Sequence, residues 1–397
     1  MTNTPKKQGT GKVCIIRHGH FPRDRRVIKE VQALCEAGYS VDVICLKAPG
    51  EKRREVVDSA NVYRLNKRFR RGPMWRYALE YGWSLASFTV MVSVLYFRRF
   101  YDCVQVNTLP DFLVFSALVP RLFGAKIVLD MHEPTPEMYQ TISGADYSPM
   151  LFRLIVFLER ISIKFAHRVY AVNDTIRERY IERGSPRHKI HVVRNVPLEG
   201  FSRMLPSPPA VKNGFQLLTH GAILKRYGHE VLIRALPLLR KHITGLHLFI
   251  VGEGEDENRL KVLCDTLDVS EMVTFTGRVP FEDVGGFIQA ADVGVVPLLD
   301  TPFSELCQPN KLFEYVASKR PVVCSRLAAI EESFDDTALM LFEAGNSNDL
   351  ARCVLELYHN PAKGREIALQ AYRRYDELRW RKTKHDYLRV FESLLNP

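Results

Sequence analysis

The sequence lacks the spacings on which several common chemistries depend. Neither G-x-x-x-x-G-K-[ST] nor G-x-G-x-x-G occurs, which excludes the standard P-loop and dinucleotide signatures. The absence of D-x-D and of G-x-S-x-G leaves no aspartate pair for a metal–diphosphate complex and no nucleophile elbow. The pairs His18/His20 and His188/His191 are spaced too closely, and lie too far from cysteine, for a zinc site. We therefore expect no metal and no cofactor.

A disulfide framework and a leader segment are also missing. The 8 cysteines are scattered without a C-x-x-C pair, and most lie in apolar runs such as Val43–Leu46. This pattern is typical of buried thiols in a reducing compartment. The first eleven residues, Met1 to Gly11, are polar and basic without an apolar run, so they do not read as a secretory signal. We expect a cytoplasmic protein.

The composition is that of an ordinary globular chain. Its 397 residues, 46% hydrophobic and 25% charged, exclude disordered, collagen-like and coiled-coil classes and favour two domains. The formal net charge of +11 favours an anionic partner: a nucleic acid, a phospholipid surface or a phosphorylated substrate. Nucleic acid is the least favoured, because the basic residues are dispersed and show no aromatic-interleaved pattern.

One segment raises the question of a membrane. Residues Trp83–Phe97 are mostly apolar but contain serine and threonine, and they fall short of the ~20 residues that a spanning helix needs. Two readings stay open: a helix that lies on an anionic membrane, and a buried crossover helix with solvated basic ends. Basic residues flank the segment on both sides, namely Lys67, Arg68, Arg70, Arg71, Arg76, Arg98 and Arg99.

Short apolar runs alternate with helical patterns along the chain. Such strands indicate parallel sheets covered on both faces, and two series of them indicate two doubly wound α/β domains. The first series is expected at Val13–Ile16, Val41–Cys45, Cys103–Val106, Lys126–Asp130, Arg168–Val172 and His191–Val193. The second is expected at Gln216–Thr219, Leu246–Val251, Val273–Thr276, Val293–Pro297, Val322–Cys324 and Ala338–Phe342.

Composition also suggests where the domains end. Proline and glycine are concentrated between Val196 and Gly214, which is typical of a linker. We expect an N-terminal domain over residues 1–197, a linker over 198–213 and a C-terminal domain over 214–376. The last segment, residues 377–397, contains an amphipathic helix that starts at Trp380.

The most informative segment is Gln308–Tyr315, which follows a strand and a polar loop. Pro309 suits the start of a helix, whose unpaired N–H groups would face an anion such as a diphosphate. Lys311 adds positive charge, and Glu314 lies on the same helix face, where a carboxylate can accept two hydrogen bonds from a ribose diol. The alternative is an ordinary surface pair of Lys311 and Glu314 on a core helix.

Three further loops follow strands of the second series. In Gly221–His229, two glycines permit close backbone approach and an unusual turn, and Lys225 and Arg226 would point at phosphate oxygens. A solvated basic turn is the alternative. Gly252–Gly254 and Gly277–Val279 are weak signals alone, but all these loops come at the carboxyl ends of strands, where ligands bind in doubly wound folds.

Two loops of the first series also follow strands. The first, Arg17–Arg26, contains Gly19, which would let backbone amides meet a phosphate or a sugar. The second, Asp130–Pro134, contains His132, which could hydrogen-bond a sugar hydroxyl or a reacting oxygen. The alternative for His132 is a loop histidine whose hydrogen bonds are satisfied within the protein.

Together these segments resemble glycosyltransferase family 4, the retaining nucleotide-sugar transferases of GT-B fold. The resemblance covers nearly the whole chain. It is carried by Phe21–Val27, Asn107–Asp111, Asp130–Glu133, Gly252–Gly254, Gly277–Val279 and Pro309–Tyr315, of which the last is the most specific.

The resemblance implies two facing Rossmann-like domains with an interdomain cleft, a donor held mainly by the C-terminal domain, and a final helix that crosses back onto the first domain. It assigns Glu314 to the donor ribose, and Lys225 and Arg226 to the diphosphate. The implied donor-binding residues are Gly19, Gly221, Gly252, Glu253, Arg278, Val279, Pro309, Asn310, Lys311 and Glu314. The implied acceptor-side residues are His18, Arg26, His132 and Glu133, and the catalytic residues are His132, Lys225, Arg226 and Glu314.

The sequence departs from the family pattern at two places. The family has a glutamate that contacts the transferred sugar where this chain has Leu306, and Glu305 is one position out of register. Ala222 and Tyr227 stand where the family has the two cations of its phosphate clamp, so the neighbouring Lys225 and Arg226 would have to substitute.

The expected function is retaining transfer of a sugar from a nucleoside diphosphate sugar to a lipid-linked or saccharide acceptor, in cell-surface polysaccharide or glycolipid synthesis. An anionic membrane surface is a further expected partner, which would make the protein peripheral. Two alternatives stay open: an epimerase or phosphorylase of GT-B fold acting on sugar phosphates, and a nucleotide-sugar-binding module that has lost catalysis.

Overall fold

The protein consists of two compact units. The structure is a computed structural model that describes residues 11–66, 74–197 and 214–395. Contacts between Cα atoms divide the chain into unit 1, Met1–Asn195 with Arg381–Pro397, and unit 2, Val196–Trp380. The expected linker 198–213 and the basic residues Lys67, Arg68, Arg70 and Arg71 lie outside the described residues, as does nearly all of the N-terminal segment Met1–Gly11.

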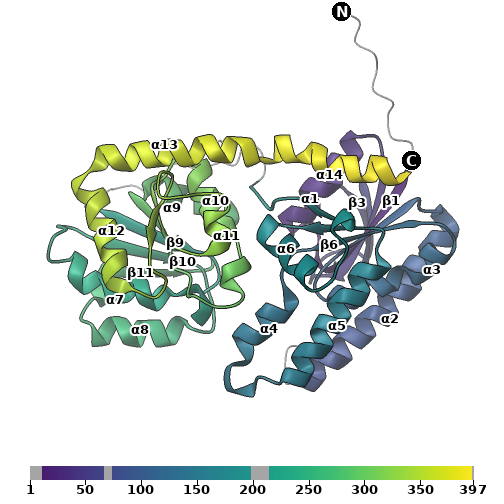
Figure 1. The fold of residues 1–397 in the computed structure, drawn as a ribbon, viewed down its shortest axis with the longest axis horizontal. Helices are drawn as coiled ribbons and strands as arrows, with labels where there is room; N and C mark the ends of the chain where they lie inside the picture. Colours follow the sequence, from purple (N-terminus) through teal and green to yellow (C-terminus); the bar gives the residue numbers. More distant parts are fainter. Residues whose placement is uncertain (1–10, 67–73, 198–213, 396–397) are drawn as a thin grey trace, which may run out of the picture. The chain divides into compact units, whose positions relative to one another are not determined.

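Unit 1 is built on an eight-stranded sheet in the order β3-β4-β2-β1-β5-β6-β7-β8 (Figure 1). All neighbouring strands are parallel except β3 and β4, which form an antiparallel edge. The strands are β1 Lys12–His20, β2 Ser40–Lys47, β3 Arg54–Val57, β4 Ala60–Asn66, β5 Cys103–Asn107, β6 Lys126–Met131, β7 Arg168–Ala171 and β8 Ile190–Val192.

The β3–β4 edge is the part of this sheet that the sequence analysis did not predict. Its turn places two non-glycine residues, Asp58 and Ser59, at positive φ angles of 48° and 68°. Hairpin turns of this kind usually contain glycine, which is the signal that sequence reading depends on. Without glycine, the four residues of β3 give no recognisable strand pattern.

Helices connect the strands of unit 1 and cover its sheet. The helix α2 is the longest of them, with 26 residues. None of the helices in the described ranges combines the length and the apolar character that crossing a bilayer would require. The helices are α1 Arg25–Glu36, α2 Met74–Arg99, α3 Leu118–Leu122, α4 Thr135–Ser143, α5 Pro149–Phe165 and α6 Asp174–Glu182, and a 3-10 helix, η1 Asp111–Ala117, precedes α3.

Unit 2 contains a fully parallel six-stranded sheet in the order β11-β10-β9-β12-β13-β14 (Figure 1). Helices α7 and α12 pack on each other, and their apolar residues join the fully buried core of this unit. The strands are β9 Gln216–His220, β10 His247–Val251, β11 Val273–Gly277, β12 Val293–Val296, β13 Val322–Ser325 and β14 Met340–Phe342. The helices are α7 His229–Leu239, α8 Glu257–Thr266, α9 Phe281–Ala290, α10 Asn310–Ala317, α11 Ala328–Glu331, α12 Ser347–His359 and α13 Pro361–Leu378.

The last helix, α14 Trp380–Leu395, packs on unit 1 although α13 belongs to unit 2. Its Tyr387 and Phe391 are fully buried, with ring centroids 5.2 Å from Tyr170 and 6.3 Å from Tyr39 respectively. Burial of two aromatic side chains stabilises this contact by several kcal/mol, at roughly 1.5–3 kcal/mol for each. The chain therefore returns to the first unit at its C-terminus.

Unit 1 also buries a cluster of carboxyl groups. Asp111, Glu137 and Glu159 are all nearly inaccessible, and Arg183 binds both glutamates. Burial raises the pKa of Asp111 to about 7. Burial also raises the pKa of Glu159 to about 8, since the neighbouring acids add to the effect and Arg183 only partly opposes it. At neutral pH Asp111 is therefore about half protonated, and Glu159 is largely protonated, in the folded chain.

The raised pKa values make the stability of unit 1 depend on pH. A carboxyl with a raised pKa binds its proton more tightly in the folded chain, so its contribution is lost as the pH rises toward the folded-state pKa. We expect the melting temperature of Asp111→Asn to fall less than that of the wild type between about pH 4 and about pH 7, the interval between the ordinary and the folded-state pKa of Asp111, because asparagine stays neutral. Calorimetric scans measure this slope. Asp146→Asn removes an exposed carboxyl from the same unit and should follow the wild type; equal slopes for all three proteins would contradict the prediction.

Candidate functional site

The loops that follow β9 and β10 in unit 2 pack backbone against backbone. A Cβ atom on Gly252 would lie 1.9 Å from the carbonyl oxygen of Gly221, and one on Gly254 would lie 2.0 Å from that of Ile223. The amides of Gly221 and Ile223 donate to the carbonyls of Val251 and Glu253, at 2.8 and 3.0 Å. Glycine is thus required for close approach at the carboxyl edge of the sheet.

The start of α10 points into the same region of unit 2. Pro309 is the residue that precedes the helix, and its side chain forms no capping hydrogen bond. Lys311 is nearly buried, and its Cε atom lies 3.7 Å from where a Cβ on Gly221 would be. Its Nζ lies 3.5 Å from Thr219 Oγ1 and 5.5 Å from the ring centroid of Tyr227. Lys311 therefore brings its amine to the glycine loop rather than to a surface pair with Glu314.

Burial lowers the pKa of Lys311 to about 8, although the Glu314 carboxylate opposes this shift. The amine sits beside Tyr227, the residue that replaces one cation of the family's phosphate clamp. A bound anion would stabilise the charged form of Lys311. Lys311 can thus supply the positive charge that Tyr227 lacks.

A histidine that the sequence analysis missed holds Glu314. His220, the last residue of β9, places its Nε2 2.6 Å from Glu314 Oε2. Its Nδ1 lies 2.8 Å from the hydroxyl of Tyr315, which also lies 3.2 Å from the carbonyl of Leu218. Among the described residues, Glu314 Oε1 has no hydrogen-bond donor, so this oxygen can accept one from a ligand. The only sequence signal was a histidine directly before Gly221.

The basic turn that was expected to meet phosphate is a 3-10 turn, Lys225–Tyr227. The guanidinium of Arg226 lies over two rings, 5.0 Å from the centroid of Tyr227 and 5.6 Å from that of Phe303. Lys225 is exposed beside it. Gly228 ends the turn with φ 66°, and a Cβ there would collide with the carbonyl of Pro297.

The remaining predicted donor-side residues of unit 2 lie on neighbouring loops. Glu253 and Arg278 follow β10 and β11, and Arg278 Nη1 lies 3.5 Å from Glu253 Oε1. Both side chains are well exposed, so this ion pair contributes little to stability. Val279 is the next residue, and it is half-buried.

In unit 1, His132 belongs to a buried hydrogen-bond network at the carboxyl ends of β5 and β6. We call Glu30, Asn107, Asp130 and His132 the His132 network. The amide of Asn107 donates to Glu30 Oε2 at 2.8 Å and to Asp130 Oδ2 at 2.9 Å. His132 Nε2 lies 2.7 Å from the same Asp130 oxygen. His132 Nδ1 has no hydrogen-bond partner among the described residues.

Burial and the neighbouring cations keep the imidazole of this network neutral. Burial, together with the nearby cations Arg26 and Arg17, lowers the pKa of His132 to about 4, although Asp130 opposes the shift. Burial and the neighbouring Asp130 raise the pKa of Glu30 well above its usual range. Burial also acts against ionisation of Asp130, but its neighbours hold the pKa of this carboxyl below the ordinary value. Glu30 is therefore protonated and Asp130 ionised.

Glu30, Asp130 and His132 bring one possible metal-binding atom each within 4.8 Å of one another. However, the N–H groups of Asn107 point at the oxygens of both acids, and His132 Nε2 already faces Asp130. The lone pairs of the carboxyl oxygens that accept hydrogen bonds from Asn107 cannot also bind a cation. The donor set thus fits a hydrogen-bond network better than a metal site.

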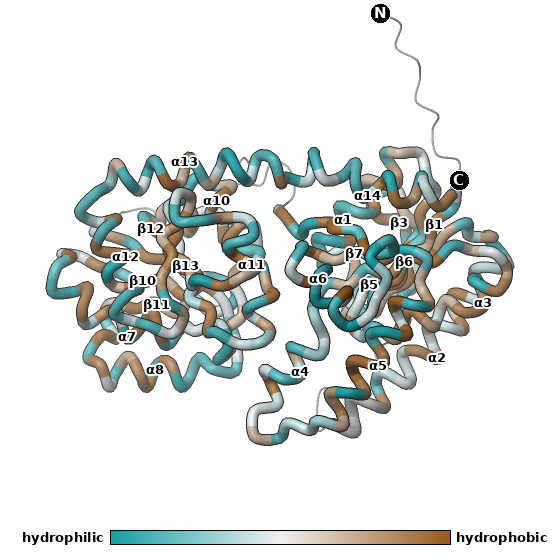
Figure 2. The backbone as a smooth tube through the Cα atoms, viewed as in Figure 1, coloured by the Kyte–Doolittle hydropathy of each residue, from teal (hydrophilic) through white to brown (hydrophobic). Residues whose placement is uncertain are grey.

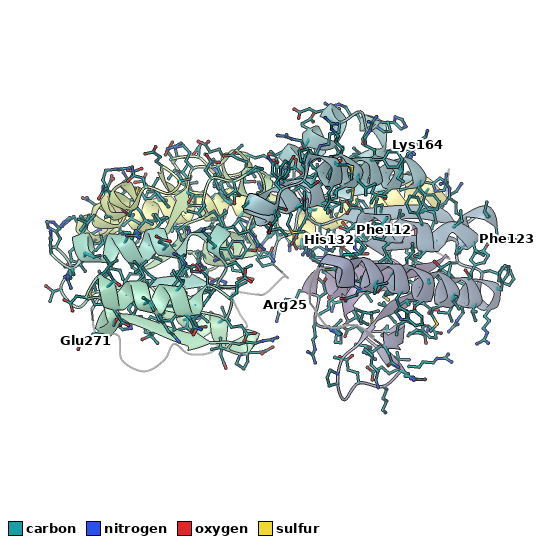
Figure 3. The ribbon with its side chains drawn as sticks, turned by 90° about the horizontal axis from the view of Figure 1, so that it is seen from below. Arg25, Phe112, Phe123, His132, Lys164 and Glu271 are labelled. Atoms are coloured by element: carbon teal, nitrogen blue, oxygen red, sulfur yellow. The ribbon has the colours of Figure 1, made fainter. Side chains whose placement is uncertain are left out.

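The other predicted residues of unit 1 lie in different surroundings. Gly19 is inside β1, where the side chain of Arg17 lies across it and pairs with Asp24 at 2.9 Å. His18 does not join the His132 network; its Nε2 lies 3.0 Å from the hydroxyl of Ser84 on α2. Figure 3 shows His132 at the same side of unit 1 as Arg25, away from Phe123. Arg26 and Glu133 are half-buried.

Comparison with known proteins gives matches over most of the chain. Residues 25–196 match the family profile "Glycosyl transferase 4-like domain", and residues 214–360 match "Glycosyl transferases group 1". Together the two matches take in more than half of the chain. The chain belongs to the GT-B glycosyltransferases. Its fold agrees with this assignment, since both units contain a doubly wound parallel sheet.

Solved glycosyltransferase-type structures share the fold. Sucrose-phosphate synthase from Thermosynechococcus elongatus superposes with a TM-score of 0.78 and 18% identity, over 97% of this chain and 99% of that one. HepE from Anabaena, in complex with UDP-glucose, superposes with a TM-score of 0.71 and 16% identity, over 96% of this chain and 100% of that one.

Sequence relatives match over shorter stretches. A lipopolysaccharide core biosynthesis glycosyltransferase, LpsD of Rhizobium meliloti (strain 1021), is 28% identical over 42% of this chain and 47% of its own length. An amylovoran biosynthesis glycosyltransferase, AmsK of Erwinia amylovora, is 26% identical over 57% of this chain and 53% of its own length. The chain thus spans about half the length of these two relatives.

The glycine loops allow a direct test of the packing in unit 2. Gly254→Ala places a Cβ against the Ile223 carbonyl, so we expect it to destabilise unit 2 by about 1–3 kcal/mol. Gly364→Ala in α13 is the matched control, because the nearest atom to its new Cβ lies 3.4 Å away and alanine favours the helix. Thermal melts should show a lower midpoint for Gly254→Ala alone. An unchanged midpoint for that variant would contradict the backbone packing described above.

Proposed function

We propose that this GT-B glycosyltransferase moves a sugar from a nucleoside diphosphate sugar to a lipid-linked or saccharide acceptor, with retention at the anomeric carbon. The proposal includes a role in polysaccharide or glycolipid synthesis. The names of LpsD and AmsK support this role, and UDP and UDP-glucose in HepE structures support a nucleotide-sugar donor.

The observation that carries the proposal is the arrangement at the start of α10. The start of α10, which Pro309 precedes without a side-chain cap, bears the buried Lys311 amine beside the glycine loop, which suits a diphosphate. One turn later, His220 fixes one oxygen of Glu314 and leaves the other as an acceptor for a ribose hydroxyl. These two features bind the two chemically distinct parts of a nucleoside diphosphate.

Catalysis in this proposal depends on charge stabilisation of the leaving group. As the bond from the sugar to the diphosphate breaks, negative charge builds on the phosphate oxygens. The fixed amine of Lys311 and the helix N–H groups stabilise that charge without reorganising, and Lys225 adds to the local potential. The proposal therefore includes no metal ion. His132, neutral and with an open Nδ1, accepts a hydrogen bond on the acceptor side.

A second candidate is a nucleotide-sugar-binding protein with little turnover. Leu306, at the position of the family's sugar-contacting glutamate, is buried. Glu305 does not replace it, because its carboxylate accepts a hydrogen bond from the Ala328 amide at 2.9 Å. Product analysis separates the candidates: sugar on an acceptor supports transfer, whereas tight donor binding without product supports the second candidate. Isomerised or phosphorolysed sugar would indicate epimerase or phosphorylase activity.

Donor binding tests the α10 assignment. We expect Glu314→Ala and Lys311→Met each to weaken binding of the preferred nucleotide by more than about tenfold. The first variant removes the acceptor for the ribose hydroxyl, and the second removes the positive charge beside the diphosphate. A thermal-shift panel of UDP- and GDP-sugars first selects the nucleotide, and titration calorimetry then measures the dissociation constant. Glu331→Gln, an exposed carboxylate of the same unit, is the control and should bind like the wild type. Wild-type affinity in the folded Glu314→Ala protein would remove the assignment.

A membrane-associated acceptor is supported by the surface of α2. The helix buries one face, which includes Phe88 and Val92, whereas the other face exposes an apolar stripe. The sequence analysis left two readings of the Trp83–Phe97 segment open, a helix lying on a membrane and a buried crossover helix. The helix combines features of both, because it packs on unit 1 and still exposes apolar side chains. The exposed stripe consists of Leu79, Trp83, Val90, Val94 and Phe97.

Neighbouring elements extend this apolar surface. Phe97 meets the exposed Phe123 beyond α3, with ring centroids 5.1 Å apart. On α5, Met150, Leu154 and Phe157 form a second exposed stripe, and Figure 2 shows the apolar character of that helix. Helices α2 and α5 both contact η1. Among the residues of these helices whose exposure is described, the exposed basic ones are Arg98, Arg153, Arg160 and Lys164. Apolar stripes with basic neighbours suit an anionic lipid surface.

Liposome flotation tests the membrane proposal. We expect binding to vesicles that contain anionic lipid at low salt, and loss of that binding in Val90→Asp/Val94→Asp, because the charges would have to enter the lipid interface. Val56→Asp is the matched control, since Val56 is equally exposed but lies on the edge strand β3. Equal flotation of both variants, or no binding by the wild type, would exclude this surface.

A further inference from the structure

The C-terminal helix is connected to the His132 network by a chain of buried hydrogen bonds. The hydroxyl of Tyr387 on α14 donates to Gln105 Oε1 at 2.8 Å. The amide nitrogen of Gln105 donates to Glu30 Oε2 at 2.8 Å and to Asn107 Oδ1 at 3.0 Å. Gln105 is fully buried in β5, so none of these groups can exchange its partner for water. Residues far apart in the sequence thus share one hydrogen-bond system.

The directions of these hydrogen bonds are fixed by the chemistry of the groups. Glu30 Oε2 and Asn107 Oδ1 are acceptors, so Gln105 must present its NH₂ group to them and its oxygen to Tyr387. Asn107 must likewise present its NH₂ group to the two acids. At the far end, the ionised Asp130 can only accept, so His132 must carry its single proton on Nε2.

We propose that Glu30, Gln105, Asn107 and Asp130 are positioning residues that hold His132 with its proton on Nε2 and its Nδ1 open to the acceptor substrate, and that Tyr387 anchors this system from α14. The proposal rests on the proposed function only for the statement that Nδ1 meets substrate. The tautomer and its dependence on Tyr387 are properties of the free protein.

The proposal gives His132 a specific chemical task. A neutral imidazole with its proton on Nε2 offers a lone pair at Nδ1, which can accept a hydrogen bond from a sugar hydroxyl and so orient it. The charged groups around His132 and its network are Arg17 from β1, Asp24 directly before α1, Arg26 and Lys29 on α1, and Asp130 from β6. Because burial, Arg26 and Arg17 disfavour an imidazolium ion, the ring orients the hydroxyl group of the substrate and does not take up its proton.

The first measurement reads the tautomer without any substrate. In the full-length protein labelled with ¹⁵N-histidine, long-range ¹H–¹⁵N spectra distinguish a protonated Nε2 from a protonated Nδ1, and a His132→Gln spectrum assigns the signal among the 12 histidines. We expect the wild type to show the Nε2–H form from about pH 5.5 to about pH 8. An imidazolium signal or the Nδ1–H form in that range would overturn the proposal.

Two variants at Glu30 test its role as a neutral hydrogen-bonding group. Glu30→Gln keeps an oxygen for Gln105 and Asn107 and an N–H group for Asp130, so we expect the wild-type tautomer. Glu30→Leu removes these partners, so we expect a shifted or mixed His132 signal. If Glu30→Gln lost the Nε2–H form as fully as Glu30→Leu, the assigned directions would be wrong.

Tyrosine variants separate anchoring from general packing. Tyr387→Phe removes the donor to Gln105, whereas Tyr170→Phe removes a hydrogen bond of 2.9 Å to the backbone carbonyl of Tyr387. Both tyrosines are buried and join the same helix to the sheet, so the two variants should lower the melting temperature by similar amounts. Only Tyr387→Phe should change the His132 signal. Equal spectra for the two variants would overturn the role of Tyr387.

Kinetics tests the part that rests on the proposed function. We expect Tyr387→Phe and Glu30→Leu to lower kcat by about tenfold and to leave the KM for the donor unchanged, because the misplaced group is on the acceptor side. Glu30→Gln and Tyr170→Phe should keep kcat near that of the wild type. Unchanged kcat in Tyr387→Phe with a shifted tautomer would show that Nδ1 does not meet substrate, whereas absence of any sugar transfer by the wild type would count against the proposed function alone.

Discussion

Buried polar groups at the carboxyl edges of the two parallel sheets can persist only where each donor meets an acceptor. In water these groups would be solvated, and an unpaired one inside the protein costs about 1–3 kcal/mol. Both candidate sites meet this constraint with side chains from several strands and helices. His220 joins Tyr315 and Glu314 in unit 2, and the His132 network pairs its groups in unit 1 except at His132 Nδ1.

The same constraint leads to opposite electrostatic results in the two units. In unit 2, one buried cation and one oriented carboxylate are brought to a helix start, which suits a ligand with a diphosphate and a ribose. In unit 1, burial and the nearby cations Arg26 and Arg17 keep His132 neutral, although the Asp130 carboxylate opposes this effect. In the proposed function, the first arrangement binds the charged donor, and the second orients a neutral hydroxyl group of the acceptor. This division agrees with a donor held by one unit and an acceptor by the other.

Much of the fold could be predicted because it depends on local patterns. Each expected strand has its counterpart in one of the two sheets, since buried parallel strands are continuous apolar runs. The segment from Pro309 to Glu314 was recognised because proline, lysine and glutamate lie within two helical turns. By contrast, the β3–β4 edge was missed because its turn uses Asp58 and Ser59 where glycine is usual.

The sequence by itself determined the two doubly wound units, the glycine loops and the α10 segment, because each depends on neighbouring residues and on helix or strand periodicity. Only the tertiary structure decided that Lys311 turns toward the glycine loop, that His220 holds Glu314, and that Tyr387 meets Gln105 282 positions earlier. The reason is that periodicity shows which face of an element is buried but not which side chain of another element it meets there. The chemistry of both candidate sites depends on those contacts between side chains of different elements.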